Sequence, residues 1–341
     1  METTKIDGME VSRIGLGTWA MGGMEWGAVP ESEAVATILS AVGRGINLID
    51  TAPIYGHGRS EELVGKALRA HGRREDFFIA TKAGLSWEGG VLTDSTEKRL
   101  RQELDDSLRR LGTDFIDLYQ IHWPDPLIPI PETAALLDEF RRAGKVRALG
   151  VSNFTPAQMR QFMAVAPLAS NQPPYNLFER SCAEGESACG EEGADKSKSV
   201  LEFCRENQIA VLTYSSLCRS LLGGRVHRGM SFDAKDIRTF DPKFQQPRFS
   251  QYMDAVEALS QLARERFGKN ILELAVRWVL DSPGVSVALW GAKRPDQLDA
   301  TAGVMGWKLD AETIAEIDRI IAATVKDPIG PEYLTPGVRD K

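Results

Sequence analysis

The sequence predicts an α/β fold, a closed (β/α)8 barrel of the TIM type preceded by a β-hairpin and accompanied by extra helices. Eight short apolar runs predict strands, a helical pattern follows each of them, and 341 residues suit one such barrel domain. Because strand and helix alternate strictly, the strands are expected to be parallel. The predicted strands are 14–18, 46–50, 77–82, 115–122, 146–151, 168–172, 209–214 and 285–290.

The residues before the first barrel strand predict a hairpin. Asp7-Gly8 lies between short alternating segments that run from Lys5 to Arg13, a pattern typical of a tight β-turn. An open dinucleotide-binding sheet would instead need a G-x-G-x-x-G motif after the first strand. The stretch Gly15-Leu16-Gly17 lacks the third glycine at the required place. The closed barrel is therefore favoured.

Helical periodicity and capping residues locate the helices between the strands. Residues 95–111 have the strongest pattern, with leucines three and four residues apart along one face. Ser60 is the expected N-cap of the helix after the second strand, and Gly144 is expected to end the helix 133–142. The other expected helices are 32–44, 156–165, 197–207, 252–267, 270–281, 295–303 and 310–323.

Two long connections interrupt this alternation. Residues 181–199 are acidic and rich in Gly, Ala and Ser, and we expect a mobile surface loop there. Residues 223–250 follow the seventh strand and contain several basic residues among Gly, Phe and Pro. A connection of that length in a compact domain is usually a functional lid or a disordered segment.

The composition excludes some classes of partner. The 41 basic and 48 acidic residues give a formal net charge of −7, whereas a nucleic-acid surface is normally basic. No apolar run approaches the roughly 20 residues of a membrane span, and the first residues carry no apolar signal region. The four cysteines form no C-x-x-C pair and are expected to be reduced. We therefore expect a cytoplasmic protein without nucleic-acid or membrane partners.

Four polar residues fall on one predicted rim of the barrel. Asp50, Lys82 and His122 end the second, third and fourth strands, and Tyr55 lies in the loop after the second. In this fold the active site is at the carboxyl ends of the strands. A lone lysine there is usually a surface charge, and a lone histidine in a strand usually belongs to the core. Together on adjacent strands, however, the four residues predict a site.

This set of residues suits protonation of a carbonyl oxygen. A buried carboxylate needs a partner, so Asp50 is expected to hold Lys82 charged and oriented. The ammonium would lower the pKa of Tyr55 from its ordinary value near 10, and a neutral His122 could orient the carbonyl. No nucleophile with a base is evident, and no metal-ligand spacing such as H-x-x-x-H occurs. The other half of the reaction must come from a cofactor, which favours hydride transfer.

The motifs around these residues resemble those of the aldo-keto reductase family, from Gly15 to about Ala323. Within the family the pattern is similar to bacterial reductases of small aldehydes and polyols, of the glycerol dehydrogenase type. The resemblance implies an NADPH-dependent carbonyl reductase that oxidises alcohols such as glycerol in reverse, with Tyr55 as general acid/base. The matching motifs are Asp50-Thr51-Ala52-Pro53-Ile54-Tyr55-Gly56, Thr81-Lys82, Gln120-Ile121-His122-Trp123-Pro124-Asp125 and Gly150-Val151-Ser152-Asn153-Phe154.

The resemblance also implies where NADP(H) would bind. Ser152, Asn153 and Gln172 would bind the nicotinamide carboxamide, and Tyr214 would stack on the ring. The expected pyrophosphate residues are Ser215, Leu217 and Arg219, and the expected residues for the adenosine 2′-phosphate are Gly291, Lys293, Arg294 and Gln297.

On physical grounds alone, Lys293 and Arg294 beside a predicted helix N-terminus form an anion site, or else two solvated basic residues. The chain departs from the family pattern at Trp290, where many relatives have Pro. It departs again at Ala300-Thr301, where relatives often have Glu-Asn.

A small-molecule carbonyl or polyol substrate is expected above Tyr55. Trp19 and Trp123, at the ends of the first and fourth strands, are expected to line its pocket together with the tail 325–341. One alternative is a cofactor-binding regulatory subunit, as the family members that accompany ion channels are. Another is a barrel lyase that uses Lys82 as a Schiff base, which would leave Asp50 and Tyr55 unexplained.

Overall fold

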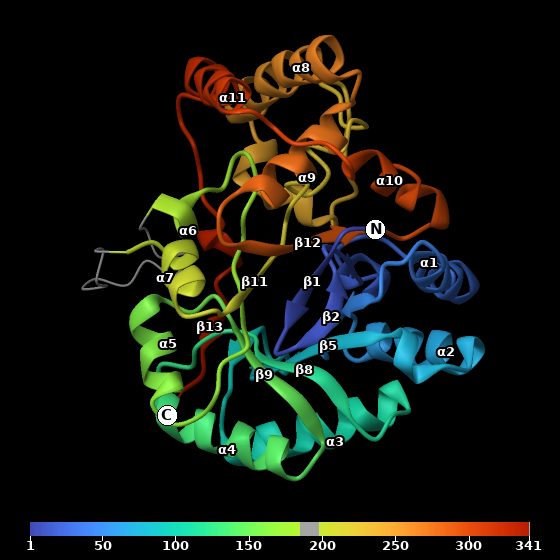
Figure 1. Ribbon diagram of the computed structural model, residues 1–341, viewed down its shortest axis with the longest axis vertical. Coiled ribbons are helices and arrows are strands. Elements are labelled where there is room, and N and C mark those ends of the chain that lie inside the picture. The colour runs from blue at the N-terminus through green and yellow to red at the C-terminus, as the bar shows by residue number, and fades with distance from the viewer. Residues whose placement is uncertain (185–197, 341) are drawn as a thin grey trace.

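Eight parallel strands close into a barrel in the computed structural model, which describes residues 1–184 and 198–340 (Figure 1). Their order around the barrel is β3-β4-β5-β8-β9-β10-β11-β12, and β12 pairs with β3 to close it. All eight predicted strands are confirmed in chain order. The barrel strands are β3 (Ile14–Gly17), β4 (Leu48–Asp50), β5 (Phe78–Ala83), β8 (Ile116–Ile121), β9 (Val146–Ser152), β10 (Ser170–Gln172), β11 (Ala210–Thr213) and β12 (Val285–Gly291).

The predicted hairpin covers the amino-terminal end of the barrel. Strands β1 (Thr3–Ile6) and β2 (Met9–Ser12) are antiparallel, and Asp7 and Gly8 form the turn with φ of 48° and 77°. Positive φ at both central residues is what a tight hairpin turn requires. Ile6 and Val11 are fully buried in one cluster with barrel residues such as Leu48 and Val287. The hairpin therefore fills this end, and the opposite end remains for a site.

Helices surround the barrel, as Figure 1 shows. They pack on the strands through buried apolar faces such as Leu100, Leu104 and Leu111 of α3. The α-helices are α1 (Glu31–Gly43), α2 (Arg59–His71), α3 (Glu97–Leu111), α4 (Ile130–Arg142), α5 (Pro156–Met163), α6 (Ser181–Glu184), α7 (Val200–Glu206), α8 (Arg248–Phe267), α9 (Ile271–Asp281), α10 (Thr301–Val304) and α11 (Ala311–Thr324). Short 3-10 turns are η1 (Trp19–Gly22), η2 (Arg74–Asp76), η3 (Ile237–Thr239), η4 (Pro242–Phe244), η5 (Pro295–Leu298) and η6 (Glu332–Leu334).

Two local predictions about helices are wrong. The predicted helix 295–303 is instead the 3-10 turn η5 followed by the four-residue helix α10. Ser60 is not the N-cap of α2, because the helix begins at Arg59 and its N-cap is Gly58. The Ser60 hydroxyl donates to Thr18 Oγ1 at 2.7 Å, so a tertiary contact takes the place of capping.

The two long connections are partly folded. Within 181–199, residues Ser181–Glu184 form α6 and Ser199 caps α7, while 185–197 lie outside the described residues. The connection 223–250 contains η3 and η4, and the Ile237 N–H donates to the Glu25 carbonyl at 2.9 Å. Among the described residues no helix is long and apolar enough to cross a membrane.

The C-terminal tail joins a small sheet at the carboxyl end of the barrel. Strand β13 (Gly337–Val338) pairs with β7 (Leu92–Thr93), which pairs in turn with β6 (Leu85–Ser86). The Arg339 guanidinium donates to the Thr93 carbonyl at 2.9 Å and to the Asp125 carboxylate. Residues near the C-terminus are thereby fixed close to the loops that follow β5 and β8.

Candidate active site

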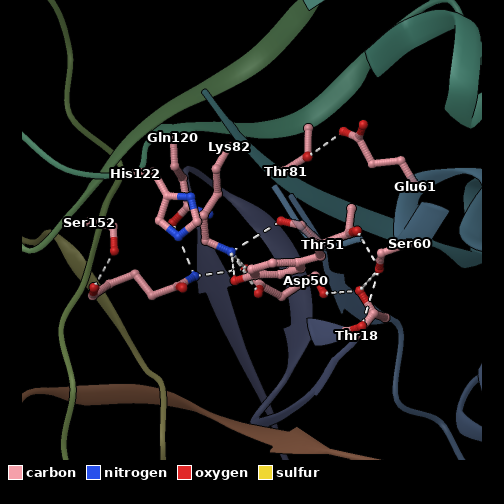
Figure 2. Close-up of polar contacts among 12 residues, drawn as sticks. Thr18, Asp50, Thr51, Ser60, Glu61, Thr81, Lys82, Gln120, His122 and Ser152 are labelled. Carbon is pink, nitrogen blue, oxygen red and sulfur yellow. Dashed lines mark hydrogen bonds and ion pairs between the residues drawn. The ribbon is translucent and has the colours of Figure 1, made fainter. Parts of the chain in front are cut away.

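The four predicted rim residues meet at the carboxyl ends of β4, β5 and β8 (Figure 2). Lys82 Nζ lies 2.9 and 2.8 Å from the two carboxylate oxygens of Asp50, and 3.1 Å from both the Tyr55 hydroxyl oxygen and the Thr51 carbonyl. The His122 ring stands edge-on to the Tyr55 ring, with centroids 5.9 Å apart and an interplanar angle of 81°. One ammonium thus connects the carboxylate to the phenol.

Buried hydroxyl groups hold the loop that carries the phenol. Thr51 Oγ1 donates to Ser60 Oγ at 3.0 Å, Ser60 Oγ donates to Thr18 Oγ1, and Thr18 Oγ1 donates to the Asp50 carbonyl at 2.8 Å (Figure 2). All three hydroxyl residues are fully buried. Since buried polar groups are costly unless they are bonded, this chain of contacts fixes both ends of the loop 51–60.

Two glycines allow the loops after β3 and β4 to touch. A Cβ on Gly56, which has φ of 66°, would lie 2.3 Å from the Gly22 carbonyl oxygen. A Cβ on Gly22 would lie 2.7 Å from the Tyr55 carbonyl carbon. Side chains at these positions would force the two backbones apart, so the glycines set the position of Tyr55 relative to Trp19, whose ring lies 6.2 Å from the Tyr55 ring.

The electrostatics correct one expectation about the phenol. Burial raises the pKa of Tyr55 well above its ordinary value of 10, and the charges of Asp50 and Glu25 raise it further. The expectation of a lowered pKa is therefore wrong, because burial disfavours the charged phenolate and the two carboxylates add to that effect. Burial also lowers the pKa of Lys82, and Asp50 opposes that shift. Tyr55 is a protonated phenol at neutral pH.

The electrostatics agree with the neutral imidazole expected at His122. Burial lowers its pKa well below 6.5, and the nearby Lys82 ammonium lowers it further. A neutral imidazole can donate a hydrogen bond from one ring nitrogen and accept one at the other. His122 and Tyr55 can therefore both donate to an oxygen placed between them.

A cavity of about 470 Å³ opens over the phenol at the carboxyl end of the barrel. Its lining contains every predicted site residue except Lys82, which is enclosed beneath Asp50 and Tyr55, and Arg294. Residues 333–337 of the C-terminal tail also contribute. The predicted residues in the lining are Trp19, Asp50, Tyr55, His122, Trp123, Ser152, Asn153, Gln172, Tyr214, Ser215, Leu217, Arg219, Gly291, Lys293 and Gln297.

The residues expected around a nicotinamide ring form one hydrogen-bonded chain. The Tyr214 hydroxyl donates to Asn153 Oδ1 at 3.0 Å, and Asn153 Nδ2 donates to the His122 carbonyl and to Ser152 Oγ, each at 3.0 Å. Ser152 Oγ donates to the Gln172 carbonyl at 2.7 Å, and Gln172 Nε2 donates to Asp50 Oδ1 at 2.8 Å. This chain of contacts links the ends of β9, β10 and β11 to Asp50 at the end of β4.

The loop after β11 has an unusual backbone. Ser215 has φ of 58°, and Cys218, Arg219 and Ser220 have φ of 45°, 49° and 71°. Left-handed non-glycine residues cost about 1–3 kcal/mol each and persist where the surrounding structure holds them, often at ligand sites. Nη2 of Arg219 is buried and has no hydrogen-bond partner among the described residues. An unpaired guanidinium donor beside the cavity fits a phosphate group.

A buried ion cluster holds this arginine. Its guanidinium is 3.3 Å from the Glu179 carboxylate and 3.4 Å from the Asp241 carboxylate, and Lys243 Nζ is 2.7 Å from Glu179. The Tyr333 hydroxyl of the tail donates to Asp241 Oδ2 at 2.7 Å, while its ring lies 5.0 Å from the Arg219 guanidinium. Burial acts to raise the pKa of Glu179, but Arg219 and Lys243 together lower it. The cluster therefore joins the 223–250 connection to the tail.

The basic pair expected at the adenosine end is arranged differently from the prediction. The backbone N–H groups of Lys293 and Arg294 both donate to Gln297 Oε1, at 2.7 and 3.1 Å. They bond within a four-residue 3-10 turn, so the expected helix N-terminus is absent from this described segment. Lys293 Nζ donates to the Trp26 carbonyl at 2.6 Å, and Arg294 pairs with Asp296 at 3.1 Å. Positive charge is present here through side chains alone.

Two of the residues that depart from the family pattern, Trp290 and Thr301, contact the turn that follows Arg294. Trp290 is buried and its Nε1 donates to the Gln297 carbonyl at 3.2 Å. The Thr301 hydroxyl donates to the Leu298 carbonyl at 2.7 Å. Both residues therefore have structural contacts that fix the turn 293–298.

Several lining residues were not anticipated from the sequence. Glu25 and Tyr333 line the cavity. Asp241, outside the lining, accepts the Tyr333 hydroxyl and pairs with Arg219, and Lys243 pairs with Glu179. Tyr333 lies in the tail that was expected to line the pocket, and Asp241 and Lys243 lie in the long connection 223–250. The individual residues could not be chosen from the sequence because the ion-cluster partners are far apart in the chain.

Comparison with known proteins agrees with the barrel fold. The family model described as "Aldo/keto reductase family" matches residues 13–322. The chain is 49% identical to "Aldo-keto reductase YhdN" of Bacillus subtilis (strain 168), over 100% of both chains. It is 34% identical to the "NADH-specific methylglyoxal reductase" of Escherichia coli (strain K12), over 84% of this chain and 88% of the relative.

Among solved structures, the glycerol dehydrogenase AKR11B4 from Gluconobacter oxydans is 46% identical and superposes with a TM-score of 0.84. The match covers 96% of this chain and 98% of that one. A barrel of eight parallel strands, a rim of Asp, Tyr, Lys and His, and a family match across nearly the whole chain lead to one assignment. The protein belongs to the aldo/keto reductase family.

Proposed function

We propose that the protein is an NADP(H)-dependent oxidoreductase that reduces small aldehydes and ketones and, in reverse, oxidises polyols such as glycerol. The observation that carries the proposal is the position of Lys82 Nζ, which contacts both the Asp50 carboxylate and the Tyr55 hydroxyl. A phenol held in this way on the floor of a cavity is suited to give a proton to a substrate oxygen. The names of two relatives, a glycerol dehydrogenase and a methylglyoxal reductase, support this substrate range.

The chain's own residues account for the proton chemistry. The carbonyl oxygen of the substrate would accept hydrogen bonds from Tyr55 and from the neutral His122. When bound, the reduced nicotinamide cofactor supplies the hydride. Tyr55 would transfer its proton to the oxygen, and the Lys82 ammonium, oriented by Asp50, would stabilise the phenolate that forms. In the direction of alcohol oxidation the same phenol would take the proton back.

Family membership does not by itself select NADP over NAD, since one relative is named as NADH-specific. Support for NADP comes from the positive side chains of Lys293, which lines the cavity, and of Arg294, the next residue in the chain. Arg238 lies close enough for its charge to lower the pKa of Lys293, after burial as the larger cause. Such a group of cations suits a phosphate monoester. The free donor of Arg219 suits the pyrophosphate.

The alternatives have less support. Lys82 is fully buried and already held by Asp50, Thr51 and Tyr55, so it is poorly placed to form a Schiff base with a substrate. None of the relatives named above is described as a channel subunit. A cytoplasmic location belongs to the proposal and is supported by the free, buried thiols of Cys182, Cys204 and Cys218.

The test is Tyr55→Phe, assayed by NADPH oxidation against a panel of aldehydes and ketones and by NADP reduction against polyols. We expect carbonyl reduction to fall by at least about a hundredfold, the lower range for loss of a general acid, while NADPH still binds. Tyr119→Phe is the matched control, because it removes another buried phenol hydroxyl, one that lies outside the cavity and has no hydrogen-bond partner among the described residues. Near-normal activity of Tyr55→Phe would refute the proposal.

A further inference from the structure

Besides Asp50, the described lining of the cavity contains one other acidic side chain, Glu25. Glu25 lies in the segment between η1 and α1 and lines the cavity. Trp19 Nε1 donates to Glu25 Oε2 at 3.3 Å, and the Glu25 carbonyl accepts the Ile237 N–H at 2.9 Å. The residue is therefore fixed at two points, through its side chain by the loop after β3 and through its backbone by the 223–250 connection.

The charge of this carboxylate is not compensated by a neighbour. The other carboxylate of the cavity, Asp50, is held at both oxygens by Lys82. Glu25 has no ion pair with any residue in 1–184 or 198–340. Its one side-chain contact is the neutral indole of Trp19. A half-buried carboxylate without a cation leaves a negative potential in the space that it faces.

That space is the one in which a carbonyl substrate would bind. The Trp19 ring that bonds Glu25 also lies against the Tyr55 ring, with centroids 6.2 Å apart and an interplanar angle of 30°. Glu25 is near enough for its charge to raise the pKa of Tyr55, after burial and Asp50 as larger causes. Substituents of a carbonyl compound bound at Tyr55 would lie within reach of the same field.

We propose that Glu25 is a specificity-determining residue whose carboxylate makes the pocket select neutral carbonyl substrates over substrates that carry a carboxylate. The inference rests on the proposed function and deepens it by naming the charge class of the substrate. Neutral aldehydes, ketones and hydroxyaldehydes are accepted, whereas oxo-acids are disfavoured by repulsion. The lining residues Trp19, Ile54, Trp123 and Leu334 are uncharged, and the two cations of the described lining, Arg219 and Lys293, are the residues assigned above to the phosphates of the cofactor.

The experiment compares two aldehydes of nearly the same shape, 4-formylbenzamide, which is neutral, and 4-carboxybenzaldehyde, which is an anion at neutral pH. The measured quantity is kcat/KM for each with NADPH, in the wild type and in Glu25→Gln. The glutamine keeps an oxygen that can accept from Trp19 Nε1 and removes only the charge. Glu88→Gln, an exposed acid in the turn between β6 and β7 outside the cavity lining, is the matched control.

We expect the wild type and Glu88→Gln to prefer the amide, and Glu25→Gln to raise the relative kcat/KM of the carboxylate by roughly fivefold or more, as one partly screened charge would require. The dissociation constant of NADPH, measured by fluorescence, should be the same in all three proteins. An unchanged ratio, or a change confined to NADPH binding, would overturn the role of Glu25 while leaving the proposed function intact. If the wild type reduced neither aldehyde nor any member of the wider panel, the proposed function itself would fail.

Discussion

Gln172 donates a hydrogen bond to the same carboxylate that holds Lys82. Its Nε2 lies 2.8 Å from Asp50 Oδ1, and Lys82 Nζ lies 2.9 Å from that oxygen. The residues are 122 positions apart in the chain, and they meet because β10 and β4 both end at the carboxyl rim of the barrel. A residue expected only to bind the cofactor therefore also contacts the carboxylate that orients Lys82.

The contact between Gln172 and Asp50 can be tested by adding a charge. In Gln172→Glu a second carboxylate would face Asp50, and two carboxylates that share a site cannot both ionise easily, so the pKa of one of them rises strongly. We expect kcat/KM to gain a new ionisation, with activity falling as the pH rises through that raised pKa. Gln102→Glu is the control, because Gln102 also donates to an aspartate, Asp106, at 3.0 Å but on the exposed surface of α3. A wild-type pH profile in Gln172→Glu would contradict the role given to this contact.

The 2′-phosphate role of Lys293 and Arg294 predicts a change of cofactor preference. Replacing both with Glu should weaken NADPH binding by at least about tenfold more than NADH binding, because charge-assisted hydrogen bonds to a phosphate are lost. Dissociation constants of both cofactors, measured by fluorescence titration, give the comparison. Arg225→Glu, which changes the charge of an exposed neighbour 3.5 Å from Asp296, controls for a general effect of net charge. Equal weakening of NADPH and NADH would argue against the assignment.

The tail depends on one buried hydrogen bond for its position at the cavity. Tyr333→Phe removes the hydroxyl that donates to Asp241 but keeps the ring beside Arg219 and Lys243. We expect the KM for carbonyl substrates to rise about two- to tenfold, the effect of losing one buried hydrogen bond. Cleavage by protease within 326–341 should also become faster. Tyr175→Phe is the control, since its hydroxyl bonds Ser282 and does not contact the tail. Equal protease rates in the two variants would show that the tail is held by other contacts.

The buried carboxyl group of Glu103, in α3, should make the stability of the protein depend on pH. Burial raises the pKa of Glu103 from 4.5 to about 7, although Arg99 and the Gly84 N–H lower it. The folded state therefore favours the protonated carboxyl group. Its contribution to the free energy of unfolding is complete below pH 4.5 and is lost as the pH rises through 7. Glu103→Gln should therefore reduce the loss of stability between pH 5 and pH 8, by at most about 3 kcal/mol.

The measurement for Glu103 is urea unfolding at four pH values, comparing the slope of unfolding free energy against pH. The Glu97→Gln variant changes an exposed acid on the same helix, one that pairs with Arg101, and it should keep the wild-type slope. Parallel slopes for Glu103→Gln and the wild type would show that this carboxyl does not titrate differently on folding.

Periodicity and spacing determined the framework of this protein. Each strand is a short apolar run, and parallel strands that alternate with helices must present their carboxyl ends at one rim, so Asp50, Lys82 and His122 could be grouped without coordinates. Both the closed barrel and the hairpin at its other end followed from such local signals. Two predictions failed: at Ser60 a tertiary contact with Thr18 takes the place of capping, and at 295–303 the local hydrogen bonds of Gln297 accompany a 3-10 turn.

Tertiary structure alone decided which residues contact one another across the barrel and how each ionisable group is shifted. The bond from Gln172 to Asp50, the cluster of Glu179 with Arg219 and Lys243, and the bond from Tyr333 to Asp241 join segments that have no shared periodicity in the chain. The pKa of Tyr55 rises rather than falls because burial is the largest influence on it, and burial is a property of the folded molecule. The sequence alone could therefore place the phenol on the rim, whereas its acidity and the charge of its pocket depend on packing in three dimensions.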